Sequence, residues 1–336
     1  MSGLASSVEM LLLTHGVTAP ETPFAGGVGY SGAVFAAVNG PDGPLILKRL
    51  RHDADWLMRL TRDTSYREAQ FAASRLPACL PAGVAAPTLG ASFDGAGRAI
   101  LMRDIGTWLL DGTDIVPEAT VDAVLRGLAE LHAAFWGTPP GGAEEVAWCD
   151  GVDFLNLLTP RTGVMLMEEG RDFGLLRGWE AFARLAPREG VALVERVRAN
   201  PAMLRIAMAP LPRTLLHGDA KLANMGIDGQ GTLWLIDWAM VACEPVAVEL
   251  AWFLAVNSSR LPWTADVVLD RYRAHLEPAL EGTGTSVRWQ EQLALIGVCG
   301  LLLYGWGKAL DAEAGSPDEL RWWCERAAAG ARALGW

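Results

Sequence analysis

The residues best suited to chemistry lie in one stretch, residues 215–238. The loop after its first apolar run carries Asp219, Lys221 and Asn224, and Asp237 stands at the end of its second apolar run. Two carboxylates, an amide and an ammonium group therefore come at the ends of two short predicted strands. A carboxylate can accept a hydroxyl proton, oxygen ligands can hold Mg²⁺, and a cation can offset phosphate charge. This set of groups suits phosphoryl transfer.

A glycine-rich stretch near the N-terminus is a second candidate for phosphate contact. Glycines let backbone N–H groups approach a phosphate closely. The Gly-x-Gly-x-x-Gly spacing also occurs in Rossmann dehydrogenases, where the loop opens a helix. Residues 33–38 and 45–48 instead predict strands, which favours an antiparallel meander, although a glycine-rich hairpin without function fits the same pattern. The candidate residues are Gly27, Gly29, Tyr30, Ser31, Gly32 and Val34.

Lys48 ends the third predicted strand, and Arg49 would face the other side of the sheet because side chains alternate along a strand. A lone lysine at a strand end is usually solvated. After a glycine-rich hairpin, however, this position suits a contact with phosphates. The expected partner of Lys48 is an acid on the next helix, which is predicted over residues 63–76.

Two motifs within 215–238 resemble a known family. His217–Asp219 with Lys221 and Asn224, and then Ile236–Trp238, are similar to the catalytic loop and metal-binding Asp of aminoglycoside phosphotransferases and choline kinases, a branch of the protein-kinase-like fold. The resemblance implies an α+β, two-lobed fold. An antiparallel five-stranded sheet would form the nucleotide-binding N-terminal lobe, and a mostly helical C-terminal lobe would carry the catalytic loop and acceptor site. The implied ranges are 1–105 and 106–336, with 143–205 as a helical acceptor-side segment.

The same resemblance implies ATP as the nucleotide and a place for it in the N-terminal lobe. Lys48 would orient the triphosphate under the glycine-rich loop. Its partner would be Glu68, because the segment Arg-Glu-Ala-x-Phe around this residue is similar to the family segment that carries the ion-pairing Glu. Backbone groups of the hinge would hold adenine. The implied hinge residues are Met102, Arg103, Asp104 and Ile105.

For the C-terminal lobe, the resemblance implies Mg²⁺ as cofactor and a role for each polar residue of the loop. Asn224 and Asp237 would bind Mg²⁺. Asp219 would accept the proton of the acceptor hydroxyl, and Lys221 resembles the lysine of serine/threonine kinases that meets the γ-phosphate. The implied reaction is transfer of the γ-phosphoryl group of ATP to a hydroxyl of a small molecule.

The sequence departs from the family pattern in places. Arg103 replaces a common Glu of the hinge, and Glu249 stands where the family has an Asp that braces the catalytic loop. Glu249 is one methylene longer, which leaves the bracing geometry open. No long activation segment ending in Ala-Pro-Glu follows Asp237, and this favours a small acceptor such as an aminoglycoside-like antibiotic, an amino alcohol or a sugar. A serine/threonine protein kinase and a nucleotide-binding pseudokinase remain alternatives.

Two histidines and two tryptophans receive further interpretations. His132 lies on the apolar stripe of a helix predicted over 117–135, so we interpret it as a hydrogen-bonded core residue. His217 is interpreted as a brace of the catalytic loop rather than a base. Trp252 and Trp263 would form an apolar or cation-binding wall near the acceptor.

The composition restricts which binding partners and which cellular compartment we expect. A net charge of −11 and a pI near 5.0 argue against nucleic acid or an anionic membrane as partner and would suit a cationic acceptor. Five cysteines without a Cys-x-x-Cys pair predict reduced thiols and a cytoplasmic protein. The longest uncharged run, residues 293–307, is short for a membrane span and predicts a core helix.

Overall fold

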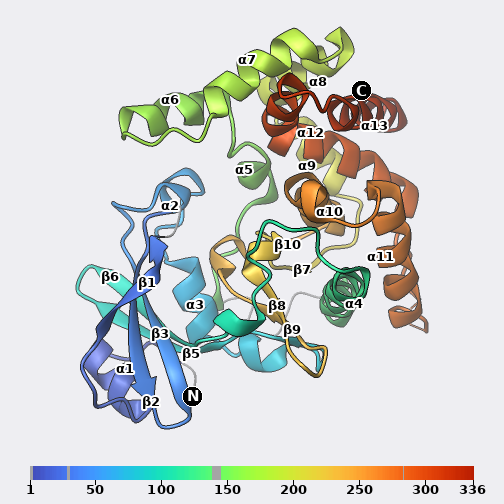
Figure 1. Ribbon diagram of the computed structural model, residues 1–336. Helices are drawn as coiled ribbons and strands as arrows, with labels where there is room; N and C mark the ends of the chain where they lie inside the picture. The colour runs from blue at the N-terminus through green and yellow to red at the C-terminus, as the bar shows by residue number, and fades with distance from the viewer. Residues whose placement is uncertain (1–2, 29–30, 138–144, 283) are drawn as a thin grey trace.

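Two lobes make up the computed structural model, which describes residues 3–28, 31–137, 145–282 and 284–336. The N-terminal lobe lies at the lower left of Figure 1 in blue and cyan, and the larger, mainly helical lobe lies beside and above it. The predicted α+β, two-lobed architecture is confirmed.

The N-terminal lobe is built on a five-stranded antiparallel sheet, as predicted, and its strand order is β1-β2-β3-β6-β5. The tight turn between β2 and β3 depends on Gly43, whose φ of 126° is one that residues with a side chain rarely adopt. The strands are β1 Thr22–Val28, β2 Val34–Gly40, β3 Gly43–Leu50, β5 Thr88–Asp94 and β6 Gly97–Arg103.

A different helix covers each face of this sheet. The alternation of side chains along β3 sends Leu45 and Leu47 to one face, where they pack with Leu11 of α1 (Val8–Thr14). The other face carries Ile46 and packs against α3 (Arg67–Ala73). Lys48 is two residues beyond Ile46 on the same strand, so it lies on the α3 face. Between β3 and α3 lies the short helix α2 (Trp56–Leu60).

Two strands, not one, lie between residues 84 and 94. Residues Val84–Ala85 form β4, which pairs in parallel with β9 of the other lobe, while β5 starts at Thr88. Pro87 lies between them, and its missing N–H interrupts a strand. The chain therefore contributes one short strand to the C-terminal lobe before it returns to the N-terminal sheet.

Short strands of the C-terminal lobe bring the polar loops together. β7 (Thr214–Leu216) pairs with β10 (Ala242–Glu244), and β8 (Met225–Ile227) pairs with β9 (Leu233–Leu235). The helices are α4 Glu118–Ala134, α5 Gly151–Leu155, α6 Pro160–Glu168, α7 Leu175–Leu185, α8 Arg188–Ala199, α9 Ala202–Met208, α10 Val246–Asn257, α11 Ala265–Ala279, α12 Trp289–Glu313 and α13 Asp318–Ala333.

Helix α12 is long and apolar enough to cross a bilayer, with a mean hydropathy of 1.7 in its most apolar window. The same window is 83% buried inside the fold, where α12 packs against α7, α10 and α13. The expectation of a core helix in this region is confirmed.

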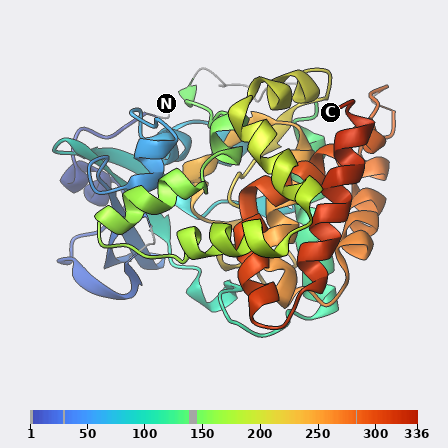
Figure 2. The same ribbon diagram turned by 90° about the horizontal axis from the view of Figure 1, so that it is seen from above.

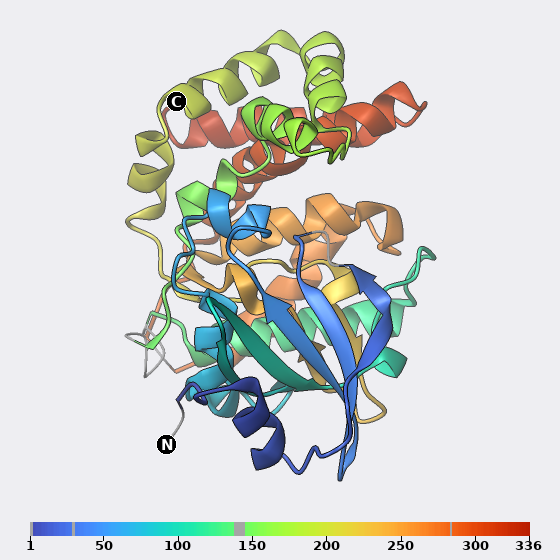
Figure 3. The ribbon, with the colours of Figure 1, turned by 90° about the vertical axis from the view of Figure 1, so that its left-hand side faces the viewer.

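Helix α2 joins the N-terminal lobe to the helices of the acceptor-side segment. Arg62 pairs with Asp153 of α5 at 3.4 Å, and Arg59 pairs with Glu169 just after α6. Seen from above, α6 extends over the N-terminal lobe (Figure 2). Figure 3 shows α6, α7, α12 and α13 as an upper layer above α10 and α11. The helical segment from residue 151 onward thus contacts the N-terminal lobe through these two ion pairs.

Candidate active site

Lys48 lies at the centre of a buried charge cluster that joins the two lobes. Its Nζ is 2.7 Å from Glu68 Oε2 on α3 and 2.8 Å from Asp237 Oδ1 in the C-terminal lobe. Burial alone would lower the pKa of Lys48, but the carboxylates of Asp237 and Glu68 outweigh it and raise the pKa above its usual value. Lys48 therefore stays an ammonium ion, which is the form that contacts phosphates.

The two carboxylates of this cluster differ electrostatically. Burial raises the pKa of Glu68 above its ordinary value, and the ammonium group of Lys48 offsets part of this. Burial would also raise the pKa of Asp237, but Lys48 and Lys221 outweigh it and lower the pKa to about 2. Asp237 is therefore ionised across the physiological range, as a metal ligand must be.

The backbone holds Asp237 in an unusual conformation. Its φ of 64° and ψ of 62° lie in the left-handed region, which Asp tolerates better than most residues with a side chain. The neighbouring Trp238 stacks on Phe71 of α3, with ring centroids 4.1 Å apart. His217 Nε2 lies 2.8 Å from the carbonyl oxygen of Ile236. These contacts fix where the Asp237 carboxylate points, and they place His217 against the backbone next to it.

The loop after β7 gathers polar groups around the carboxylate of Asp219. Lys221 Nζ and Asn224 Nδ2 donate to Asp219 Oδ2 at 2.8 Å and 2.9 Å. The indole N–H of Trp252 on α10 donates to Asp219 Oδ1 at 2.8 Å. The structure therefore brings together Asp219, Lys221 and Asn224, which the sequence predicted as one unit, and it adds Trp252.

Asn224 and Asp237 offer oxygen atoms of the kind that suit a Mg²⁺ ion. They come from adjacent chain segments, because the N–H of Ile236 donates to the carbonyl oxygen of Asn224 at 3.0 Å. An amide oxygen and a carboxylate are hard ligands, and Mg²⁺ is often held by one or two such groups together with phosphates and water. Within residues 3–28, 31–137, 145–282 and 284–336, no three His, Cys, Asp or Glu side chains could hold a metal alone.

Glu249 of α10 braces the loop after β7 through the backbone. The N–H of Gly218 donates to Glu249 Oε1 at 2.6 Å, so the longer side chain reaches the loop. Glu249 Oε2 is 2.7 Å from His132 Nε2, and His132 Nδ1 is 2.6 Å from the hydroxyl oxygen of Tyr272. All three side chains are fully buried, which confirms His132 as a hydrogen-bonded core residue. Only glycine fits at position 218, where φ is 86° and a Cβ would lie 1.9 Å from the carbonyl oxygen of Met240.

The glycine-rich stretch is described in part. Gly27 belongs to β1 and Ser31 and Gly32 lead into β2, whereas Gly29 and Tyr30 lie outside the described residues. Gly32 has a φ of 113°, which favours glycine. A Cβ on Gly32 would lie 2.5 Å from the carbonyl oxygen of Ala54 in the loop before α2.

The pairing register places Val34, a predicted residue of the nucleotide site, on the face of the sheet away from Lys48. Val34 pairs with Arg49, and Phe35 pairs with Lys48. Residues that pair directly across two strands share a face, so Phe35 lies on the side of Lys48 and Val34 lies on the other side. The side chain of Val34 is also among the exposed apolar ones, at 61%.

The predicted hinge residues lie at the end of β6 and directly after it, and their side chains point in different directions. Met102 pairs with Ile46 and so lies on the face of Lys48, while Arg103 pairs with Leu45 on the other face and is exposed. The N–H of Asp104 donates to the carbonyl oxygen of Pro44, and Ile105 is buried.

Arg67 is a buried residue of the site that the sequence analysis did not single out. Its Nε donates to the carbonyl oxygen of Ala147 at 2.6 Å, and its Nη1 donates to that of Ala239 at 2.7 Å. Arg67 directly precedes Glu68, so it fastens the start of α3 to the segment that follows Asp237. The sequence signal for Arg67 was a charged residue beside Glu68 in the Arg-Glu-Ala-x-Phe segment. The partners of Arg67 are backbone groups, however, and no sequence motif reveals them.

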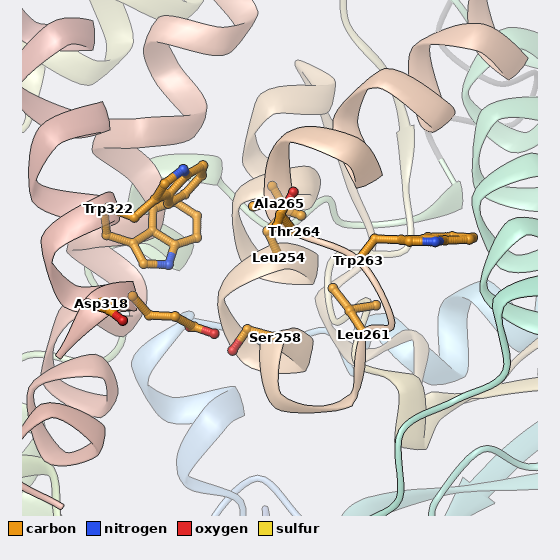
Figure 4. Close-up of a pocket in the computed structure, with 10 residues that line it drawn as sticks. Leu254, Ser258, Leu261, Trp263, Thr264, Ala265, Asp318 and Trp322 are labelled. Atoms are coloured by element: carbon orange, nitrogen blue, oxygen red, sulfur yellow. The ribbon is translucent and has the colours of Figure 1, made fainter. Parts of the chain in front are cut away.

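A separate cavity of about 260 Å³ lies at the far end of α10, between η6 (Ser258–Arg260) and the start of α13 (Figure 4). Its lining includes Leu254, Trp263 and Trp322. Leu254 is two residues from Trp252, and residues two apart on a helix point in different directions. Trp252 accordingly points away from this cavity and contacts Asp219. Trp263 lines the cavity, and the guanidinium of Arg271 lies 3.9 Å from its ring centre.

Comparison with known proteins gives one family match. The model of the phosphotransferase enzyme family matches residues 22–289 of this chain. No curated protein sequence matches the chain.

Similar solved structures share little sequence with the chain. Macrolide 2'-phosphotransferase MphH from Brachybacterium faecium is 16% identical, with 96% of this chain and 95% of that chain covered and a TM-score of 0.49. For choline kinase LicA from Streptococcus pneumoniae the identity is 13%, the coverage 97% and 96%, and the TM-score 0.44. For an aminoglycoside-3'-phosphotransferase of type VIII these values are 17%, 88% and 97%, and 0.46.

Proposed function

This chain belongs to the phosphotransferase enzyme family, and we propose that it transfers the γ-phosphoryl group of ATP, with Mg²⁺, to a hydroxyl group of a small molecule. The family supports small-molecule phosphotransfer. The more specific proposal, transfer from Mg²⁺-ATP to a hydroxyl group, rests on the contact of one buried lysine with carboxylates from both lobes. Lys48 reaches Glu68 and Asp237 at once, and Lys48 and Asp237 are 189 residues apart in the chain.

The proposed nucleotide site lies between the glycine-rich stretch and this cluster. Lys48 would contact the phosphates while Glu68 holds its ammonium group in place. Asn224 and Asp237 would hold Mg²⁺, which would offset the negative charge of the phosphates. Adenine would lie against the hinge after β6, on the face of the sheet that carries Met102.

The proposed base is Asp219. Its carboxylate would accept the hydroxyl proton as the acceptor oxygen attacks phosphorus. Lys221 would contact the transferred phosphoryl group. Burial alone would lower the pKa of Lys221, but Asp219 and Asp237 raise it above its usual value, so Lys221 stays charged. The free cysteines of the chain, Cys79, Cys149, Cys243, Cys299 and Cys324, support a reducing compartment such as the cytoplasm.

An ATP-consumption screen tests the proposal. The purified chain would be incubated with Mg²⁺-ATP and a panel of hydroxyl compounds that includes aminoglycosides, macrolides, amino alcohols and sugars, and ADP release would be measured. We expect release that depends on one class of acceptor and stops when EDTA removes Mg²⁺. A chain that binds Mg²⁺-ATP but turns over none of these compounds, and no protein, would be a pseudokinase instead.

A further inference from the structure

We propose that Trp252 is a positioning residue that orients the carboxylate of Asp219 for proton transfer. The inference rests on the proposed function, in which Asp219 accepts the proton of the acceptor hydroxyl. The indole N–H of Trp252 donates to Asp219 Oδ1 at 2.8 Å. Trp252 lies on α10, 33 residues beyond Asp219, so the bond joins the catalytic loop to a rigid helix.

The donors to Asp219 leave one acceptor position open. In the described part of the chain, Oδ2 accepts from Lys221 Nζ and Asn224 Nδ2, and Oδ1 accepts from Trp252 Nε1. An ionised carboxylate has about four positions that can accept a hydrogen bond, two on each oxygen. The position that remains belongs to Oδ1, the oxygen held by Trp252.

This arrangement decides which oxygen of Asp219 takes the proton. The O–H bond of the acceptor breaks, its proton passes to Oδ1, and the freed oxygen forms a bond to phosphorus as the bond to the leaving nucleoside diphosphate breaks. The carboxylate must therefore present Oδ1 to the acceptor. Lys221 and Asn224 hold only Oδ2, so the bond from Trp252 is what fixes Oδ1.

The indole is itself held by two aromatic neighbours from other helices. The ring of Phe154 on α5 lies 6.1 Å from that of Trp252 at 84°, and the ring of Tyr304 on α12 lies 5.9 Å away at 81°. Edge-to-face contacts on two sides restrict the rotation of the ring. The N–H is therefore aimed at Oδ1 before any substrate arrives, as a preorganised donor should be.

The molecule contains a natural control for this bond. Trp234 of β9 also donates its indole N–H to a carboxylate, Asp228 Oδ2, at 3.0 Å. Asp228 lies in the turn between β8 and β9, where Oδ1 accepts from the N–H groups of Gln230 and Thr232. An indole–carboxylate hydrogen bond thus stabilises a turn at Asp228 and orients the proposed base at Asp219.

Substitution by phenylalanine removes the N–H and keeps an aromatic ring. For Trp252→Phe we expect kcat to fall about tenfold or more, since a hydrogen bond to a charged group is lost, while KM for Mg²⁺-ATP changes less than about twofold. Trp234→Phe should leave both constants within about twofold of the native values. The assay uses the acceptor found by the ATP-consumption screen. Native turnover by Trp252→Phe would overturn the inference, as would an equal loss of kcat and nucleotide affinity.

A spectroscopic test does not depend on turnover. The indole N–H signal of Trp252 in a ¹⁵N-labelled sample is identified by its loss in Trp252→Phe. We expect this signal to shift in Asp219→Asn and to stay unchanged in Asp228→Asn, which should shift only the signal of Trp234. A Trp252 signal that ignores Asp219→Asn would overturn the inference.

The two proposals can fail separately. A native chain that turns over an acceptor, with Trp252→Phe equal to it, refutes the role of Trp252 alone. A native chain that turns over no hydroxyl compound refutes the proposed function, and with it the role of Trp252 in proton transfer, even where the NMR response shows the hydrogen bond.

Discussion

The nucleotide side and the base side of the candidate site are held together in different ways. Lys48 is held by opposite charges, the buried Glu68 on α3 and the half-buried Asp237 after β9, so both lobes must meet to form this cluster. Asp219 is held within the C-terminal lobe by Lys221, Asn224 and Trp252. The proposed base is therefore held by one lobe alone, whereas the proposed nucleotide site depends on how the two lobes are placed. Substitutions around Lys48 should therefore affect nucleotide binding, and substitutions around Asp219 should affect the rate of the chemical step.

The largest effect is expected for Asp237→Ala. Loss of a proposed Mg²⁺ ligand removes several kcal/mol of charge stabilisation, so kcat should fall by about 10³-fold or more. The rise in melting temperature that Mg²⁺-ATP gives to the native chain should also disappear. Asp228→Ala, a change at a surface turn, is the matched control. A Mg²⁺-dependent shift of native size in Asp237→Ala would contradict the assignment.

The next effect concerns stability. Lys48→Met leaves Glu68 and Asp237 close together without their cation, and loss of one partner from a buried ion pair costs about 3–5 kcal/mol. Lys221→Met, which removes a partly exposed cation from Asp219, should cost about 1 kcal/mol or less. Urea unfolding of both variants measures the difference. Equal losses would show that the two regions are not held in different ways.

A smaller effect is expected for Glu249→Gln. The amide oxygen can still accept from the N–H of Gly218, but an amide nitrogen, which cannot accept a hydrogen bond, then faces His132 Nε2, which should cost about 1–2 kcal/mol. Because this brace lies in the C-terminal lobe, kcat should fall a few-fold while the affinity for Mg²⁺-ATP is unchanged. Isothermal titration with the nucleotide and steady-state kinetics give the two values. A matching drop in affinity would link Glu249 to the nucleotide side.

The smallest effect concerns the pH dependence of the free energy of unfolding. The pKa of Asp237 is lowered to about 2, below the ordinary value near 3.9, so its ionised form stabilises the fold above about pH 4. This contribution is lost as the pH falls through about 2. The stability difference between the native chain and Asp237→Asn should therefore be constant from pH 5 to 8 and shrink below pH 4. A difference that changes most between pH 6 and 8 would mean that another group titrates.

Local sequence was enough to predict the groups of the C-terminal lobe loop. Asp219, Lys221, Asn224 and Asp237 lie at the ends of short apolar runs, and such strand ends meet in the fold. Lys48 was also predictable, because the glycine-rich hairpin and the third strand are continuous in sequence.

Three features could not be predicted, and each has a physical reason. The side of the sheet on which Val34 lies depends on pairing register, and a shift of one residue moves a side chain to the other face. Arg67 binds backbone carbonyl groups of residues 147 and 239, which a motif does not record. The bond from Trp252 to Asp219 depends on how α10 packs against the loop.

The rate of phosphoryl transfer by Asp219→Asn tests the central claim most directly. The amide cannot accept the hydroxyl proton, so we predict a fall in kcat of roughly 10²–10⁴, with Mg²⁺-ATP affinity close to native because the Lys48 cluster is untouched. The measurement is single-turnover transfer from Mg²⁺-ATP to the acceptor that the native chain uses. Native turnover by Asp219→Asn would contradict the account.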